Sequence, residues 1–289
     1  MKLGYRNADT ILAWRDHDYF DFNPQQKHEF NARMQRQLAW HRYEQLPEYA
    51  VFLGTTIGKV RQELKHDDVV WFVDGFNARY RIIVNRGIDD AAEMLATLKP
   101  EQLVALQKQW DKDNRKFVRE RELDYSLAER KRARLKQTLE QIRDWTGSLT
   151  YDQEQKIAAL LEPVLLIDHL RHQDRIRRQK EFLEMLKLRA NRPAFQPKLH
   201  AWLLDWESGR NPEYAKLSAE VYEQRIQFYI AVDKLLTPGQ RQIVLRRLRE
   251  YVDDCNALSQ KPAKTALHSS GAVSLAAFRL GAIDAGLPE

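Results

Sequence analysis

Apolar residues recur at helical spacing along most of this chain, in tracts separated by short polar breaks. Phe30, Met34 and Leu38 follow one another every four residues, and later tracts repeat this spacing. A period of three to four residues places apolar side chains on one face of a helix. The pattern therefore predicts an all-α protein of about eight to ten helices. The predicted helices cover residues 24–45, 47–65, 66–84, 89–98, 101–145, 150–161, 163–191, 194–206, 212–235 and 238–258.

The longest tract, from Glu101 to Trp145, contains neither glycine nor proline. A single helix over this tract would span on the order of 65 Å, far more than a compact bundle needs. Either the helix breaks near residues 124–126, where Ser126 and Glu129 match a capping box, or the molecule is long. The tract favours an elongated or curved, cradle-like assembly.

Composition supports a folded helical chain. Of its 289 residues 43% are hydrophobic and 30% are charged, and 11 glycines and 10 prolines are too few for a strand-and-turn fold. We predict a single elongated helical domain over residues 1–258, with a subdivision near 146–149 as the alternative. Residues 259–289 change to Ser, Ala, Gly and Lys, which predicts a loosely ordered tail.

Four of the predicted helices begin with the same pattern: an apolar residue, a cap, two spacers and Gln. At Thr237 the hydroxyl is placed to accept the N–H of Gln240, and the Gln240 side chain to accept the N–H of Thr237. Pro238 fits the first helical position because it lacks a backbone donor. Lys99 is a poor cap, whereas the other copies fit well. The motif residues are Asn23, Gln26, Gln102, Thr150, Gln153, Thr237 and Gln240.

Each copy of this pattern, taken alone, is explained by capping of the helix that it begins. Capping boxes can equally be written with Ser, Asp and Glu, yet all four copies use Gln. A functional signature therefore stays open beside the capping interpretation.

Charge favours an anionic or acidic partner only weakly. The formal net charge is +6, but 41 acidic residues are interleaved with 47 basic ones. Two basic runs, at 129–136 and 171–180, and the aromatic stretch at 40–43 could form a contact surface, or the runs could be solvated faces. The predicted partner surface consists of Trp40, Tyr43, Arg130, Arg132, Arg134, Arg175 and Arg178.

Catalytic chemistry is not expected. Cys255 is the only cysteine, which excludes an intrachain disulfide and a cysteine-based metal cluster. His169 and His172 share one helix face but lack a partner in a known metal motif. The phosphate-loop, nucleophile-elbow and zinc-protease motifs are absent, so we expect no catalytic residue, cofactor or metal.

Two resemblances bear on function. The repeated Leu-Thr-x-x-Gln pattern resembles the signature of periplasmic helical cradle proteins, a family that includes the ATP-independent chaperone Spy. The blocks at 5–26, 38–53 and 206–254 together resemble an uncharacterised family of bacterial lipoproteins. That resemblance implies a periplasmic, all-helical protein, anchored by lipid on a cysteine just before a segment like Leu3-Gly4-Tyr5.

These features favour a lipid-anchored periplasmic binding protein of the chaperone or envelope-stress type, with protein clients as partners. A structural scaffold lipoprotein of an envelope complex is the alternative. A cytoplasmic nucleic-acid-binding protein is a second alternative, which the chain disfavours because it has no helix-turn-helix, zinc-finger or RNA-binding signature.

Overall fold

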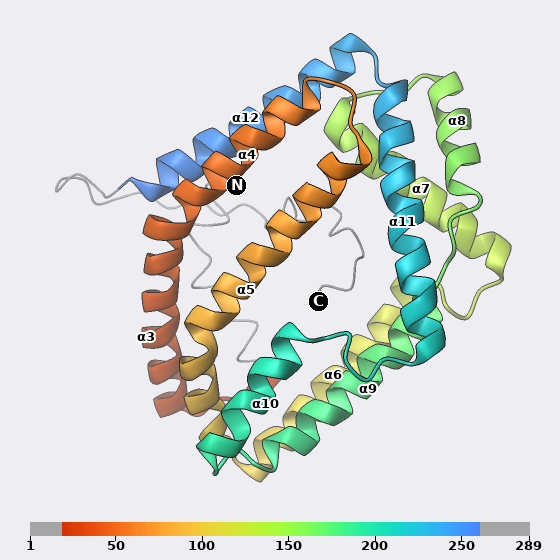
Figure 1. Cartoon of the computed structure of the whole chain (residues 1–289). Helices are drawn as coiled ribbons and strands as arrows, with labels where there is room; N and C mark the ends of the chain where they lie inside the picture. Colours follow the sequence, from red (N-terminus) through yellow and green to blue (C-terminus); the bar gives the residue numbers. More distant parts are fainter. Residues whose placement is uncertain (1–18, 261–289) are drawn as a thin grey trace.

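The computed structural model describes residues 19–260, and over this range the chain forms helices and loops without a strand. The prediction of an all-α, multi-helix protein is confirmed. A π-helical turn, His41–Gln45, joins the first two helices. The helices, labelled as in Figure 1, are α3 (Pro24–Trp40), α4 (Leu46–Val60), α5 (His66–Ala96), α6 (Pro100–Glu120), α7 (Leu127–Thr146), α8 (Tyr151–Leu161), α9 (Asp168–Leu186), α10 (Arg192–Leu204), α11 (Pro212–Leu235) and α12 (Pro238–Ser259).

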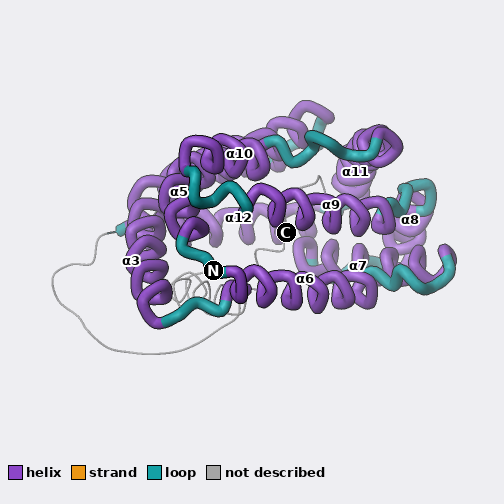
Figure 2. The backbone as a smooth tube through the Cα atoms, turned by 90° about the horizontal axis from the view of Figure 1, so that it is seen from below, coloured by secondary structure: helices purple, strands orange, loops and turns teal. Residues whose placement is uncertain are grey.

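The helices form an open frame rather than a parallel bundle (Figure 1). One side of the frame is α3, the next is α4 beside α12, the third is α11 with α7 and α8, and the last is α6 beside α9. Helix α5 crosses the frame as a diagonal, with α10 packed against it. Seen from below, α6 and α7 follow one another along one edge, with α9 beside them (Figure 2).

Several apolar clusters hold this frame. Helices α4 and α12 pack along their lengths because each presents an apolar stripe at helical spacing. Their shared core consists of Leu46, Ala50 and Ile57 on α4 and Leu245, Leu248, Cys255 and Leu258 on α12. A second core joins α5, α6, α9 and α10, and its centre is Leu106, Leu186, Phe195 and Leu199.

The long tract breaks where a cap was predicted. Helix α6 ends at Glu120, and Ser126 begins α7 by accepting the Glu129 N–H while Glu129 accepts the Ser126 N–H. A loop over residues 147–150 joins α7 to α8. Gly147 there has a φ of 82°, a conformation that favours glycine because it has no Cβ.

The predicted helix end at Asn85-Arg86-Gly87 is wrong, because α5 continues through it to Ala96. Val84 and Ile88 lie one turn apart on either side of Gly87 and are both buried. Burying two such side chains stabilises the helix by more than the roughly 1 kcal/mol that a mid-helix glycine costs. Packing therefore overrides the local signal.

The other predicted boundaries hold to within a few residues except at two helices. Helix α4 ends at Val60 rather than near residue 65, and α9 begins at Asp168 and ends at Leu186 rather than covering 163–191. Helix α12 ends at Ser259. The predicted tail lies almost wholly outside the described residues.

Candidate functional site

The beginnings of α3 and α6 are joined by a buried pair of glutamines. Gln26 Nε2 donates to Gln102 Oε1 at 3.2 Å, and Gln102 Nε2 donates to Gln26 Oε1 at 2.9 Å. Each Oε1 also accepts the backbone N–H of its own helix cap, from Asn23 and Lys99. The remaining donors reach backbone carbonyls, since Gln26 Nε2 bonds the Thr97 oxygen at 3.0 Å. We call this arrangement the α3–α6 clamp.

The beginnings of α8 and α12 are joined in the same way. Gln153 Nε2 donates to Gln240 Oε1 at 2.8 Å, and Gln240 Nε2 donates to Gln153 Oε1 at 3.0 Å. The caps Thr150 and Thr237 each donate a backbone N–H to their glutamine. Gln240 Nε2 also reaches the Ser148 carbonyl at 2.8 Å. This α8–α12 clamp lies at the opposite corner of the frame (Figure 1).

The clamps explain why all four helix starts use Gln. A primary amide carries two donors and an oxygen with two lone pairs, so two glutamines can pair reciprocally and still satisfy a cap and a carbonyl. A Glu side chain has no donor when ionised, so two of them would repel instead. Complete capping boxes are present at Asn23, Thr150 and Thr237. The pairing joins residues 76 and 87 positions apart, which the sequence could not show.

A cavity of about 340 Å³ lies between α4, α5, α7, α11 and α12. We call it the central cavity. Its wall is largely apolar and aromatic, with Trp71 and Phe72 from α5, Ile142 and Trp145 from α7, and Phe228 and Val232 from α11. Leu161 at the end of α8 also lines it, and because six helices supply the wall, the site exists only in the assembled frame.

An aromatic cluster fixes the α5 side of the central cavity. The Phe52 ring on α4 lies 4.8 Å from that of Trp71 and 5.4 Å from that of Phe72, measured between centroids. This close approach requires Gly75, because a Cβ there would overlap the Phe52 ring. Arg79 lies over the other side of the cluster, 3.9 Å from the Phe52 centroid.

Two of the acidic groups that line the central cavity are paired with basic side chains. Lys59 Nζ lies 2.7 Å from Asp68 Oδ1, and this hydrogen bond lowers the pKa of the Asp68 carboxyl. Asp233 is held by Arg241 at 2.8 Å and accepts the Leu64 N–H at 2.9 Å. Because these charges are paired within the fold, the apolar wall is the main surface there for binding.

The predicted basic surface is not a single patch. Arg130 is buried, Arg134 lies partly buried at the central cavity, and Arg132 is exposed. Arg175 donates to Asn114 Oδ1 at 3.0 Å, and Arg178 donates to the Trp202 carbonyl at 2.9 Å. Burial lowers the pKa of the Arg178 guanidinium, which also stacks 4.5 Å from the Trp202 ring centroid.

The predicted aromatic residues, Trp40 and Tyr43, are partly buried at the joint between α3 and α4. Arg86 lies 5.8 Å from the Trp40 ring centroid. They lie outside the central cavity. The aromatic residues of the cavity itself were missed, although Trp71 and Phe72 are adjacent in an apolar run and Trp145 lies between two polar residues.

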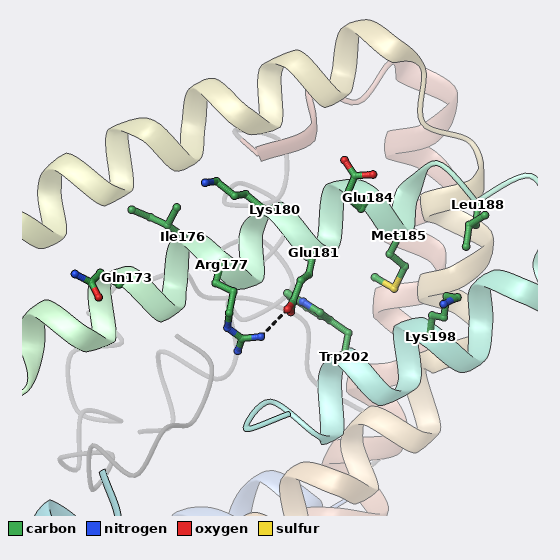
Figure 3. A pocket seen from close by; sticks show the side chains of 10 residues that line it. All are labelled: Gln173, Ile176, Arg177, Lys180, Glu181, Glu184, Met185, Leu188, Lys198 and Trp202. Carbon is green, nitrogen blue, oxygen red and sulfur yellow. Dashed lines mark hydrogen bonds and ion pairs between the residues drawn. The ribbon is translucent and has the colours of Figure 1, made fainter. Parts of the chain in front are cut away.

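A second hollow, a groove of about 650 Å³, runs between α9 and α10 (Figure 3). Met185 and Trp202 give it apolar surface, and Arg177 bonds Glu181 across one turn at 2.6 Å. That ion pair joins residues four apart, at the end of the second basic run. Two helices line this groove against six for the central cavity, so the central cavity is the stronger candidate site.

Among residues 19–260, no three or more His, Cys, Asp or Glu side chains form a group that could hold a metal ion. His172 stacks on Phe117 with centroids 5.6 Å apart, and burial lowers the pKa of its imidazole. None of the described helices has the length and apolar character needed to cross a membrane.

Comparison with known proteins gives one match, to a family model that covers residues 18–215. Neither the curated proteins nor the solved structures give a match. The matched range takes in the α3–α6 clamp and much of the central cavity. Because the match spans more than half of the sequence, the chain belongs to DUF6279, a family of unknown function.

Proposed function

We propose that the protein is a binding protein that holds apolar segments of other proteins in the central cavity, as an ATP-independent chaperone. The observation that carries this proposal is the aromatic wall around a volume of about 340 Å³. That volume lies within the range of ligand sites and suits several apolar side chains of an extended segment. Aromatic surface of this kind gives binding that adapts to different sequences.

Exposed charge would assist the encounter with acidic clients. The chain carries a formal net charge of +6, and Arg132 on α7 is exposed. Long-range attraction raises the association rate more than it raises the affinity. Of the five predicted arginines, Arg132 is therefore the one suited to steering, whereas Arg130 is buried and Arg178 donates to the Trp202 carbonyl.

A periplasmic, lipid-anchored location is part of the proposal. It rests on the resemblance of the sequence blocks to bacterial lipoproteins. The genomic sequence upstream of Met1 tests it, since a lipoprotein signal ending in cysteine is expected there. A start codon at Met1 with no such signal would contradict the anchor.

Filling the central cavity tests the binding function. Thr138 lines the cavity from α7, so Thr138→Trp should occupy the space that a client needs. Thr55→Trp, at an exposed position on α4, is the matched control. We expect the wild type and Thr55→Trp to suppress aggregation of an unrelated unfolded protein, followed by light scattering at near-stoichiometric amounts. Thr138→Trp should lose most of this protection.

Loss of protection counts only if Thr138→Trp keeps its helical circular dichroism and thermal midpoint. The chaperone proposal fails if the wild type protects no model client. It also fails if Thr138→Trp protects as well as Thr55→Trp.

A scaffold function has one specific observation in its favour. Tyr125 and Leu127 lie close together at the α6–α7 corner and are 59% and 58% exposed. Neighbouring exposed apolar residues mark an interaction site more often than scattered ones do. A scaffold should recover one defined envelope protein in a pull-down and lose it with Tyr125→Ser and Leu127→Ser. Unchanged recovery would exclude this corner as the binding surface.

A further inference from the structure

Three arginines converge on one carboxylate at the place where α6 ends and α7 and α9 begin. Arg130 Nη2 lies 3.8 Å from Asp168 Oδ2, and Arg121 Nε and Arg171 Nη1 each lie 4.0 Å from Asp168 Oδ1. These distances allow charge attraction but are too long for hydrogen bonds. The Asp168 side chain is only 11% exposed, so the group is well shielded from water.

Within this cluster, Arg130 gives the main evidence for a bound ligand. The residue is 8% exposed, and its Nε and Nη2 atoms are buried without a hydrogen-bond acceptor. A buried donor on a charged group costs more than a neutral one when it lacks an acceptor. A ligand with a negatively charged acceptor would therefore satisfy the buried Nε and Nη2 donors of Arg130.

A pocket of about 260 Å³ gives access to this point. Arg121, Arg130 and Asp168 line it, together with Arg134 and Lys136 from α7. Three glutamates also line it: Glu120 and Glu140 are exposed, where water and salt screen their repulsion, and Glu122 is half-buried. The buried part of the pocket is thus more basic than its outer part.

We propose that this pocket binds a phosphate-type oxyanion. The guanidinium fork of Arg130 presents two parallel donors, the geometry that a phosphate group accepts. Arg121 and Arg171 add positive charge beside it, and the anion would take the place that Asp168 fills only at long range. Arg134 lines both this pocket and the central cavity, but Arg130 and Asp168 line only the pocket, so the proposed anion site does not depend on the chaperone proposal.

Thermal unfolding with added inorganic phosphate tests this proposal. Phosphate should raise the midpoint of the wild type more than sodium chloride of equal ionic strength does, because binding stabilises the folded state. Arg130→Gln should abolish the difference between the two salts. Arg132→Gln removes the same charge two residues away at an exposed position and should leave the difference unchanged. Equal shifts with phosphate and chloride in the wild type, or a retained difference in Arg130→Gln, would overturn the site.

A second variant is expected to strengthen phosphate binding instead of weakening it, and a poorly folded protein could not give that result. Asp168→Asn removes the carboxylate that competes with the anion, and it should tighten phosphate binding several-fold in calorimetric titration. Unchanged or weaker binding in this variant would overturn the proposal.

A vesicle assay distinguishes a lipid headgroup from a free anion as the natural ligand. If the natural ligand is a lipid headgroup, vesicles of phosphatidic acid in phosphatidylcholine should retain the wild type and Arg132→Gln but release Arg130→Gln. If the ligand is a free anion, inorganic phosphate alone should show the Arg130 dependence. The absence of an Arg130 dependence from both arms contradicts the site.

Discussion

The α3–α6 clamp and the α8–α12 clamp perform the same task with different helix caps. In the α8–α12 clamp both caps are threonines whose hydroxyls accept a backbone N–H from the glutamine. In the α3–α6 clamp Asn23 caps α3, but Lys99 has no side-chain acceptor and α6 begins without that bond. The glutamine pairs are nevertheless alike, with all four side chains between 5% and 8% exposed.

The comparison of the two clamps shows which residue of the motif contributes to the tertiary structure. The cap residue serves its own helix and can vary, whereas the glutamine serves the partner helix and does not. Each clamp closes one corner of the frame through uncharged hydrogen bonds. The corner between α3 and α4 has no clamp and depends instead on the π-helical turn around His41.

The largest effect is expected from Gln240→Glu in the α8–α12 clamp and Gln102→Glu in the α3–α6 clamp. An ionised carboxylate keeps the bonds that the oxygen accepts but cannot donate to the partner glutamine or to the backbone carbonyl. We expect a loss of about 2–4 kcal/mol in the free energy of unfolding at neutral pH, similar in both clamps. Urea denaturation measures it.

Gln25→Glu is the control for this pair, because Gln25 is exposed and lies next to Gln26. It should change stability by less than about 0.5 kcal/mol. A cost at Gln102 far below that at Gln240 would show that the two clamps are not equivalent.

Acid should open the unclamped corner before either clamp. Burial lowers the pKa of His41 to about 4 from 6.5, and the ring nitrogen lies 3.3 Å from the Tyr49 hydroxyl. The unfolded chain therefore binds a proton at higher pH than the folded chain, so stability is full above pH 6.5 and falls as pH drops towards 4. The upper limit of this loss is about 3 kcal/mol, and partial exposure of the ring reduces it to about 2.

Hydrogen exchange followed by mass spectrometry between pH 7 and pH 5 measures this loss locally. Exchange should rise first in residues 38–50, relative to the intrinsic rate at each pH, and later in the clamps. His41→Phe should remove the pH dependence at this corner. Simultaneous opening of the clamps and the corner would contradict the comparison.

The smallest effect is expected from the caps. Thr237→Ala removes an N-cap acceptor and should cost about 1 kcal/mol. Lys99→Ala removes no acceptor and should cost less than about 0.5 kcal/mol. Thermal unfolding of the two variants measures the contrast, and Lys99→Thr should stabilise α6. An equal cost for Thr237→Ala and Lys99→Ala would show that the caps are not what distinguishes the two clamps.

Local interactions made much of the fold predictable. The capping boxes at Thr150 and Thr237, the break before Ser126 and the ion pair of Arg177 with Glu181 all join residues three or four apart. Such interactions depend on helix geometry alone, so spacing in the sequence suffices to predict them.

Long-range packing determined the features of the fold and of the candidate site that the sequence did not predict. Helix α5 runs through Gly87 because its neighbours bury Val84 and Ile88, and nothing next to Gly87 in the sequence indicates this. The basic runs looked like one surface, yet Arg130 is buried beside Asp168 on α9 while Arg132 is exposed. The central cavity also results from long-range packing, because six separate helices supply its wall.

By itself, the sequence determined the helices, where most of them begin and end, and the repeated use of Gln at four starts. The tertiary structure alone decided that those glutamines join in pairs, Gln26 with Gln102 and Gln153 with Gln240. The two kinds of interaction differ in how far apart their partners lie along the chain. A cap is satisfied within one turn of its own helix, whereas an amide pair requires two distant helix ends to meet away from water.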